Sequence, residues 1–161
     1  VVDDGSTDST AEIVKLAAKS NQKIIYIYQQ NRRIGAARNT GIKQATGAWI
    51  AFLDADDLWV PDKLQRQIEV INSKDVDVVF TGGYLFNEEN NDLTTYPIIT
   101  GEFTGHNLYK KQFYTNYIPV LSVLVKKSYV DLVGFQDEHE YAYGCEDYDY
   151  WMRLCNKGAR F

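Results

Sequence analysis

Cysteine is scarce in this sequence, which limits the chemistry that the chain can perform. The two cysteines, Cys145 and Cys155, lie ten residues apart, with no C-x-x-C motif and no histidine at a ligand-like spacing. Disulfide exchange and zinc binding both depend on such close spacings. We therefore expect both thiols to be reduced and to have a structural role.

Long apolar runs and basic charge are also lacking. The chain has no run of 18 apolar residues, no charged-then-apolar opening segment and no N-x-S/T sequon. These absences argue against a membrane-spanning helix in this sequence and give no sign of secretion. We expect a cytoplasmic protein, and peripheral association with the inner face of a membrane would need no anchor in this segment. The net charge of -5 and the pI near 5.0 argue against nucleic acid as a partner, because nucleic acid requires a basic face.

The sequence does contain enough apolar material for one core. Of its 161 residues, 45% are hydrophobic and 14% are aromatic, as in globular domains. We expect a single domain over residues 1–161. The opening VVDDG has the pattern of the end of a buried strand, and in the closing KGARF Gly158 suits a helix C-cap. We therefore expect a domain that is truncated at both ends.

Apolar periodicity alternates between strand and helix along most of the chain. This alternation predicts an α/β fold with a mainly parallel central sheet and helices on both faces. Ser9 and Glu12 have the spacing of a capping box, Pro61 suits the first position of a helix, and Gly134 can end one. The expected elements are a helix after Ser9 with Ile13, Leu16 and Ala17 on one face, a strand over 23–28, a helix over 35–46 whose small residues allow close backbone approach, a strand over 48–53, a helix from Pro61 with Leu64, Ile68 and Ile71 on one face, strands over 76–86 and 121–127, a helix over 128–133, and a helix over 146–157 with Trp151, Leu154 and Cys155 on its buried face.

Residues 87–120 differ from the rest of the chain. They are polar and aromatic, with weak periodicity. The segment is too long for a simple turn, so we expect a functional insertion at the surface.

Acidic residues gather at the ends of two predicted strands. VVDDG places Asp3 and Asp4 after one strand, and FLDADDLW places Asp54, Asp56 and Asp57 after another. In an open parallel sheet, ligands bind at the carboxyl ends of the strands. Two unit charges about 4 Å apart repel by about 4 kcal/mol at an effective dielectric of 20. The second cluster therefore indicates a divalent cation with oxygen ligands.

The acidic motifs also suit other structures and functions. The first motif, taken alone, suits a helix-entry loop, because aspartate, serine and threonine favour turns and caps. An EF-hand loop starting at Asp54 would need an acid or amide, a glycine and a glutamate where the chain has Leu58, Trp59 and Gln65, so that reading fails. A metal-dependent phosphoryl-transfer enzyme is a minor alternative, because neither the usual Gly-Thr continuation nor a phosphate-binding loop is present.

Five segments carry a resemblance to a known family. VVDDGSTDST, NRRIGAARNTGI, GAWIAFLDADDLWVPDKL, VDLVGFQDE and GCEDYDYWMRL follow one another in this order over nearly the whole chain. In order and approximate spacing they resemble a family 2 glycosyltransferase, an inverting enzyme of the GT-A fold. The resemblance implies transfer of a sugar from a nucleotide-diphosphate sugar, by family preference UDP-linked, to a hydroxyl of a saccharide or lipid-linked acceptor. It also implies Mg²⁺ or Mn²⁺ as cofactor and places residues 87–120 on the acceptor side.

The resemblance assigns the donor-binding residues. Asp4 matches the acid that binds the base of the nucleotide sugar, and Asp3 is expected to support the turn. Arg38 matches a basic position beside the donor diphosphate, although a solvated surface salt bridge is its alternative. Asp54 and Asp56 match the D-x-D motif that binds the ribose and the metal, with Asp56 as the first choice for the metal. Asp57 is expected to be a loop residue.

The resemblance also implies that Asp147 is the catalytic base. Asp147 precedes Trp151 by four residues, which places it on the buried side of a helix near that helix's N-terminus. A helix N-terminus favours an ionised carboxylate by about 0.3–1 kcal/mol. Nearby like charges would instead raise its pKa, because no Lys or Arg lies between residues 135 and 149. The neighbouring acids are Asp137, Glu138, Glu140, Glu146 and Asp149. In the simpler alternative, Glu146 and Asp147 only cap a helix.

Two classes of function are therefore open. The first is a metal-dependent inverting glycosyltransferase with one aspartate base. The second is a nucleotide-sugar-binding fragment without turnover, because the first strand of the family is missing from this sequence.

Overall fold

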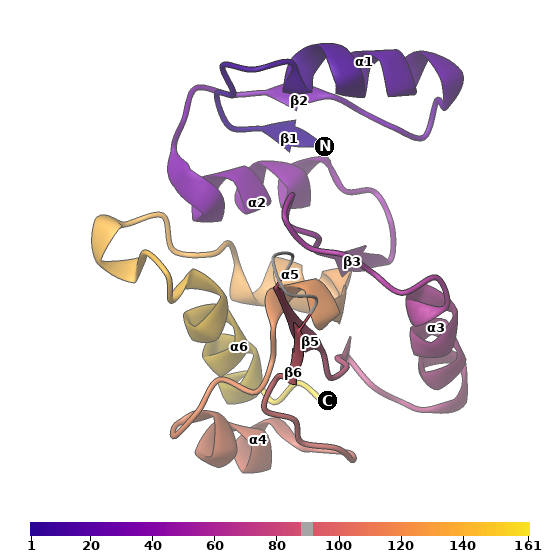
Figure 1. The fold of residues 1–161 in the computed structure, drawn as a ribbon. Helices are drawn as coiled ribbons and strands as arrows, with labels where there is room; N and C mark the ends of the chain where they lie inside the picture. The colour runs from indigo at the N-terminus through magenta and orange to yellow at the C-terminus, as the bar shows by residue number, and fades with distance from the viewer. Residues whose placement is uncertain (88–91) are drawn as a thin grey trace. The chain divides into compact units, whose positions relative to one another are not determined.

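The computed structural model describes residues 1–87 and 92–161 and shows alternating helices and strands (Figure 1). By their internal contacts the residues form two compact units, Val1–Thr46 with Phe135–Asp147, and Gly47–Gly134 with Tyr148–Phe161. The helices are α1 (Thr10–Ser20), α2 (Arg33–Gln44), α3 (Lys63–Ser73), α4 (Gly105–Gln112), α5 (Lys127–Val133), α6 (Glu146–Asn156) and the 3-10 turns η1 (Val120–Ser122) and η2 (Glu140–Ala142). The strands are β1 (Val2–Asp3), β2 (Ile27–Tyr28), β3 (Trp49–Ala51), β4 (Val78–Val79), β5 (Tyr84–Asn87), β6 (Asp92–Thr95) and β7 (Leu124–Lys126).

The first unit contains the predicted strand-helix-strand step. Strands β1 and β2 pair in parallel, with α1 between them in the chain. The predicted capping box is wrong, because the Ser9 side chain makes no cap hydrogen bond. Asp8 takes its place and accepts hydrogen bonds from the backbone N–H and the hydroxyl of Thr10, at 3.0 and 2.6 Å. Within the described part of the chain no residue of α1 is buried, so the predicted apolar face of this helix packs no core.

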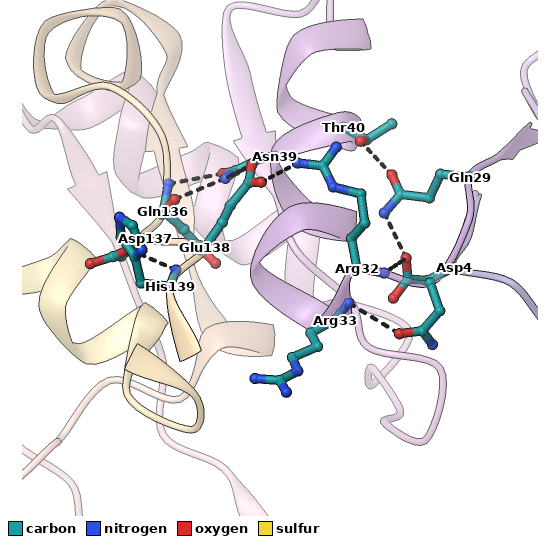
Figure 2. Close-up of polar contacts among 11 residues, drawn as sticks. Asp4, Gln29, Arg32, Arg33, Asn39, Thr40, Gln136, Asp137, Glu138 and His139 are labelled. Carbon is teal, nitrogen blue, oxygen red and sulfur yellow. Dashed lines mark hydrogen bonds and ion pairs between the residues drawn. The ribbon is translucent and has the colours of Figure 1, made fainter. Parts of the chain in front are cut away.

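Helix α2 approaches the segment 135–147 so closely that it needs a glycine. A Cβ atom on Gly35 would lie 2.9 Å from the backbone oxygen of Asp137, closer than real Cβ contacts allow. Asn39, which is fully buried, then joins the two segments: its side-chain amide donates to the Gln136 carbonyl at 2.8 Å, and its oxygen accepts from the Gln136 N–H at 2.8 Å (Figure 2). The small residue Gly35 therefore allows the close backbone approach that the sequence predicted for this helix.

The second unit contains a sheet whose middle strand runs against its neighbours. The strand order is β3-β7-β4, and β7 pairs antiparallel with both. Strands β3 and β4, joined through α3, are therefore parallel to each other, as the strand-helix-strand pattern predicts. The direction of β7 was not predicted, because an apolar run carries no sign of its direction and the long connection before it permits either.

Polar residues of α3 are buried where apolar ones were expected. The helix begins at Lys63, two residues after Pro61, and its buried residues are Lys63 and Gln67. Leu64 and Ile68 are 40% and 43% exposed, so the predicted face is wrong. Gln67 is buried in place of these apolar residues, because its amide nitrogen donates to the carbonyls of Ser122 and Val79, at 2.7 and 3.2 Å.

Helix α6 agrees with its prediction. Trp151, Leu154 and Cys155 are all at most 2% exposed. After the helix, Gly158 has φ +79° and its N–H donates to the Cys155 carbonyl, while Ala159 donates to Leu154, as in a Schellman motif. Both cysteines are free, as expected, and burial raises the pKa of the Cys155 thiol to about 12. Cys145 is exposed, so the structural role predicted for it is wrong.

The remaining predictions concern residues 76–126. The strand predicted over 76–86 is divided into β4 and β5, and β5 forms an antiparallel hairpin with β6. Helix α4 lies within the predicted insertion over 87–120, whose residues 88–91 are outside the described residues. Helix α5 ends at Gly134, as predicted, with φ +86° at that glycine. No helix in the described ranges has the length and apolar character needed to cross a membrane.

Candidate active site

Asp4 lies directly after β1, in a network that starts in α2 (Figure 2). Its Oδ1 atom accepts hydrogen bonds from the Gln29 amide at 2.6 Å and from the backbone N–H of Arg32 at 2.9 Å. Gln29 is itself held by the hydroxyl of Thr40, which donates to its oxygen at 2.5 Å. The carboxylate of Asp4 is therefore oriented before any ligand binds, by Gln29 just after β2 and by Arg32 at the N-cap of α2.

Asp3 has the supporting role that the sequence suggested. It is buried, and its two oxygens accept hydrogen bonds from the Ser6 N–H at 2.8 Å and from the Tyr26 hydroxyl at 2.6 Å. These bonds, that of Tyr26 first, hold the pKa of Asp3 below its usual value. The same bond raises the pKa of Tyr26 to about 12. Asp3 therefore stays ionised and closes the turn that presents Asp4.

Arg38 forms a buried ion pair with Glu146. Its Nη1 lies 3.1 Å from Glu146 Oε1, and the two side chains are only 9% and 8% exposed. Glu146 also accepts a hydrogen bond from the Gly144 N–H at 2.8 Å. The alternative of a solvated surface salt bridge is therefore wrong, because this pair is shielded from water. The pair joins α2 to the start of α6.

Asp147 is the second residue of α6 and is half-buried. Its neighbour Glu146 is the buried end of the ion pair with Arg38, so the backbone that carries Asp147 is held from inside the unit. The structure confirms that Asp147 lies at a helix N-terminus, where the helix dipole stabilises negative charge.

Three acids near Asp147 form ion pairs with arginines that lie about 100 residues earlier in the chain. Arg32 pairs with Glu138, Arg33 pairs with Glu140 at 2.9 Å, and Arg38 pairs with Glu146. All three arginines come from residues 32–38, at the start of α2. The crowding of like charges expected from the sequence is therefore relieved by tertiary contacts. Sequence analysis missed Arg32, Arg33 and Gln29, and the only local sign was the cluster of basic residues in NRRIGAARN.

A small pocket lies between the start of α2 and the segment before α6. Its enclosed space is about 10 Å³, room for about one water molecule. Charged side chains and two rings surround it. The lining consists of Arg32, Arg33, Ile34, Gly35, Ala36, Asp137, Glu138, His139, Tyr143 and Glu146. The pocket therefore has the size of a single water molecule or hydroxyl group.

Asp54, Asp56 and Asp57 lie in the second unit, in a turn after β3. The Asp57 N–H donates to the Asp54 carbonyl at 3.2 Å, which closes the turn. Asp56 is exposed, whereas Asp54 and Asp57 are half-buried. The end of this loop is anchored by Trp59, whose ring nitrogen donates to the Leu121 carbonyl at 2.8 Å.

Lys63, the first residue of α3, contacts the end of the same loop through Trp59. Its Nζ lies 4.3 Å from the centroid of the Trp59 ring and donates to Gln67 Oε1 at 2.8 Å. Burial lowers the pKa of Lys63 to about 8. The chain just after the Asp54–Asp57 turn is therefore held by contacts with buried polar residues of α3.

The donor atoms of this loop fit a divalent cation that also binds a ligand. Within residues 1–87 and 92–161, no three acidic, histidine or cysteine side chains form a ready metal cage. Mg²⁺ and similar hard cations commonly use one or two carboxylates and complete their shell with water and phosphate oxygens. Asp54 and Asp56 supply two carboxylates at a strand end, so their chemistry suits such a shared site.

The comparisons with known proteins decide the family. The family model described as "Glycosyl transferase family 2" matches residues 1–132. The chain belongs to this family. A glycosyltransferase of Methanocaldococcus jannaschii is 29% identical over the whole of this chain, which covers 54% of that protein.

Two solved structures share the fold of this family 2 member. The S. aureus TarS crystal structure has a TM-score of 0.76 at 22% identity and covers 98% of this chain. The mannosyltransferase PcManGT of Pyrobaculum calidifontis, solved with GDP-Man and Mn²⁺, has a TM-score of 0.67 at 20% identity and covers 99%. The chain spans 27% and 43% of the lengths of these two proteins. The α/β, GT-A fold class is therefore confirmed.

The contribution of the buried Arg38–Glu146 ion pair to stability can be tested. We expect Glu146→Gln to lower the free energy of unfolding by about 2 kcal/mol, because it leaves Arg38 buried without its counter-charge. Urea unfolding followed by circular dichroism measures the change. Glu140→Gln is the matched control, since Glu140 is 87% exposed and exposed pairs contribute about 0–1 kcal/mol. Equal losses for the two variants would contradict the shielding of the Arg38–Glu146 pair.

Proposed function

We propose that this family 2 glycosyltransferase transfers a sugar from a nucleoside-diphosphate sugar to a hydroxyl of a saccharide or lipid-linked acceptor, with inversion at the anomeric carbon. One observation carries the proposal. A single helix, α2, binds Asp4 through the N–H of its N-cap residue Arg32 and binds Glu146, the neighbour of Asp147, through Arg38. The proposed donor-binding acid and the proposed base are thus held by one rigid element.

In this proposal Asp4 binds the nucleotide and Asp147 is the catalytic base. Asp4 accepts a hydrogen bond from the base of the nucleotide, and its own hydrogen bonds to Gln29 and Arg32 orient it for that purpose. Asp147 takes the proton of the acceptor hydroxyl as the oxygen attacks the anomeric carbon from the face opposite the diphosphate. No general acid is required, because a nucleoside diphosphate whose charge is neutralised is a good leaving group.

Asp54 and Asp56 would hold a divalent cation, Mg²⁺ or Mn²⁺, with Asp56 as its main ligand and Asp54 shared with the ribose. The cation would neutralise the charge that develops on the leaving diphosphate. The relative from Pyrobaculum calidifontis solved with Mn²⁺ supports a metal, although its donor is GDP-Man rather than a uridine nucleotide. We keep UDP as the proposed nucleotide.

Arg38 has a structural partner that the sequence did not indicate. Arg38 forms an ion pair with Glu146, and the pair is buried. We propose that Arg38 stands beside the donor diphosphate while it holds Glu146, so that one guanidinium serves both. Residues 87–120 are proposed to border the acceptor, and the catalytic domain is proposed to be one functional domain over residues 1–161. A cytoplasmic location, with peripheral contact to the inner face of a membrane, suits a lipid-linked acceptor.

A donor-turnover assay tests the proposed function. The protein is incubated with UDP- and GDP-linked hexoses and Mn²⁺, and the released nucleoside diphosphate is measured with and without EDTA. We expect release from a UDP-sugar that EDTA reduces at least about 100-fold, because the metal neutralises the leaving group. Proton NMR of the glycoside product shows the anomeric configuration.

The other outcomes separate the alternatives. Binding of UDP by calorimetry without turnover would favour a nucleotide-sugar-binding fragment. Release of inorganic phosphate would favour the phosphoryl-transfer alternative. Turnover that is insensitive to EDTA would contradict the metal role of Asp54 and Asp56.

A further inference from the structure

Three aromatic side chains stand exposed just before Asp147, and we call them the ring cluster: His139, Tyr141 and Tyr143. Tyr141 is 80% exposed and Tyr143 is 68% exposed. The rings of His139 and Tyr141 stack, with centroids 5.2 Å apart and planes 10° from parallel. Large exposed aromatic side chains that gather in one segment mark a binding surface more often than a packing one.

The ring cluster is held by contacts with Arg33 and by the turn that carries it. The guanidinium of Arg33 lies 5.6 Å from the centroid of the Tyr143 ring, and Arg33 also pairs with Glu140 at 2.9 Å. The turn η2 closes through the Ala142 N–H, which donates to the His139 carbonyl at 3.0 Å. Rings fixed in this way lose little conformational entropy when a ligand packs on them.

Arg33 holds the cluster from a strained position. Its φ is +71°, a left-handed conformation that a side chain larger than glycine rarely adopts. Such strain costs about 1–3 kcal/mol and is found preferentially at ligand-binding sites. The strained residue here is the one that contacts Tyr143, so the strain and the ring cluster belong to one arrangement.

The small pocket opens beside these rings. His139 and Tyr143 line it, together with Glu146 and the closely packed Gly35. Its two arginines, Arg32 and Arg33, pair with Glu138 and Glu140, so the pocket offers balanced charge rather than a cationic surface. Balanced hydrogen-bonding groups beside aromatic faces suit a neutral polyhydroxylated ring better than a diphosphate.

We infer that the ring cluster and this pocket bind a sugar ring of the acceptor. The inference rests on the proposed function, because it places the acceptor beside the proposed base. The C–H face of a pyranose would pack on Tyr143 or on the Tyr141 ring, and one hydroxyl would enter the pocket. Tyr143 precedes Asp147 by four residues and lines the same pocket as Glu146, the residue before the proposed base.

The test uses the full chain with methyl glycosides of glucose, galactose, mannose and N-acetylglucosamine as acceptor probes. We expect Tyr143→Ala and Tyr141→Ala each to raise the acceptor KM about tenfold, equivalent to about 1.4 kcal/mol of lost binding. Donor KM and the rate of donor hydrolysis by water should stay within about twofold of wild type, because the rings touch only the acceptor. Tyr143→Trp should restore acceptor KM, since it keeps a flat aromatic face.

Tyr84→Ala is the matched control. Tyr84 is 68% exposed, as is Tyr143, but lies on β5 in the other unit. We expect no change in acceptor KM for this variant. Saturation-transfer NMR with the same glycosides reports binding without turnover, and we expect its signal to fall for Tyr143→Ala but not for Tyr84→Ala.

The outcomes distinguish this inference from the proposed function. If wild type neither hydrolyses nor transfers a donor sugar, the proposed function fails, and the NMR comparison alone then decides whether the rings bind sugar. If wild type transfers sugar but Tyr143→Ala and Tyr141→Ala leave acceptor KM and the NMR signal unchanged, the ring cluster is not an acceptor site. A rise in donor KM instead of acceptor KM would assign the rings to the donor and overturn the inference.

Discussion

Replacement of Asp147 with asparagine should lower the rate of sugar transfer by about 10²–10⁴-fold, because a positioned base contributes a factor of this size. Asparagine has nearly the same shape as aspartate but cannot accept a proton from the acceptor hydroxyl. We expect UDP binding to stay close to the wild-type value, because Asp4 and its partners are unchanged. Steady-state transfer kinetics and calorimetry with UDP measure the two quantities.

Asp149→Asn is the control for this variant. Asp149 lies two residues further along α6 and pairs with Arg153 at 2.7 Å, on a partly exposed face. An exposed i, i+4 pair contributes about 0.3–0.5 kcal/mol, so we expect near-normal transfer. Transfer that survives Asp147→Asn, or that falls equally in both variants, would remove Asp147 from the role of base.

Replacement of Asp56 with alanine should weaken the Mn²⁺-dependent binding of UDP at least about 100-fold. Loss of groups that only support a metal ligand commonly reduces metal affinity 10–100-fold, and Asp56 is proposed to contact the cation itself. The residue is exposed, so its replacement should not unfold the chain. Calorimetry of UDP binding in Mn²⁺ and in EDTA measures the metal-dependent part.

Asp62→Asn is the control for the metal prediction. Asp62 is a nearby acid at the N-cap of α3, and it pairs with Arg66 of that helix at 2.7 Å on the surface. We expect Mn²⁺-dependent binding of UDP to be unchanged in this variant. If UDP binds wild type equally well in Mn²⁺ and in EDTA, or if Asp56→Ala behaves as Asp62→Asn does, the assignment of Asp56 is wrong.

Parts of the fold were predictable because they depend on short-range spacing. The buried face of α6 follows from Trp151, Leu154 and Cys155 at helical spacing, and the end of α5 follows from Gly134. The small residues of α2 predicted close approach, and Gly35 confirms it. Local geometry decides each of these features, so a pattern of a few residues is sufficient to indicate them.

Other parts were not predictable because distant residues decide them. Lys63 and Gln67 are buried in α3, although Leu64 and Ile68 are more apolar, because the carbonyls of Ser122 and Val79 need hydrogen-bond donors. Each buried carbonyl left unpaired costs about 1–3 kcal/mol, which is comparable with the gain of about 1.5–3 kcal/mol from burying one apolar side chain. Those carbonyls lie on segments that follow α3 in the chain, outside any local window.

The candidate site divides in the same way. Its acids were visible in the residues themselves, because a strand-end aspartate and a helix-start aspartate have local signatures, and the resemblance of five ordered segments indicated family 2. The tertiary structure alone decided how these acids are held. Arg38 meets Glu146 across 108 residues, and Arg32 and Arg33 meet Glu138 and Glu140 over similar separations. An ion pair depends on which segments the fold brings within a few ångströms, and no spacing along the chain contains that information.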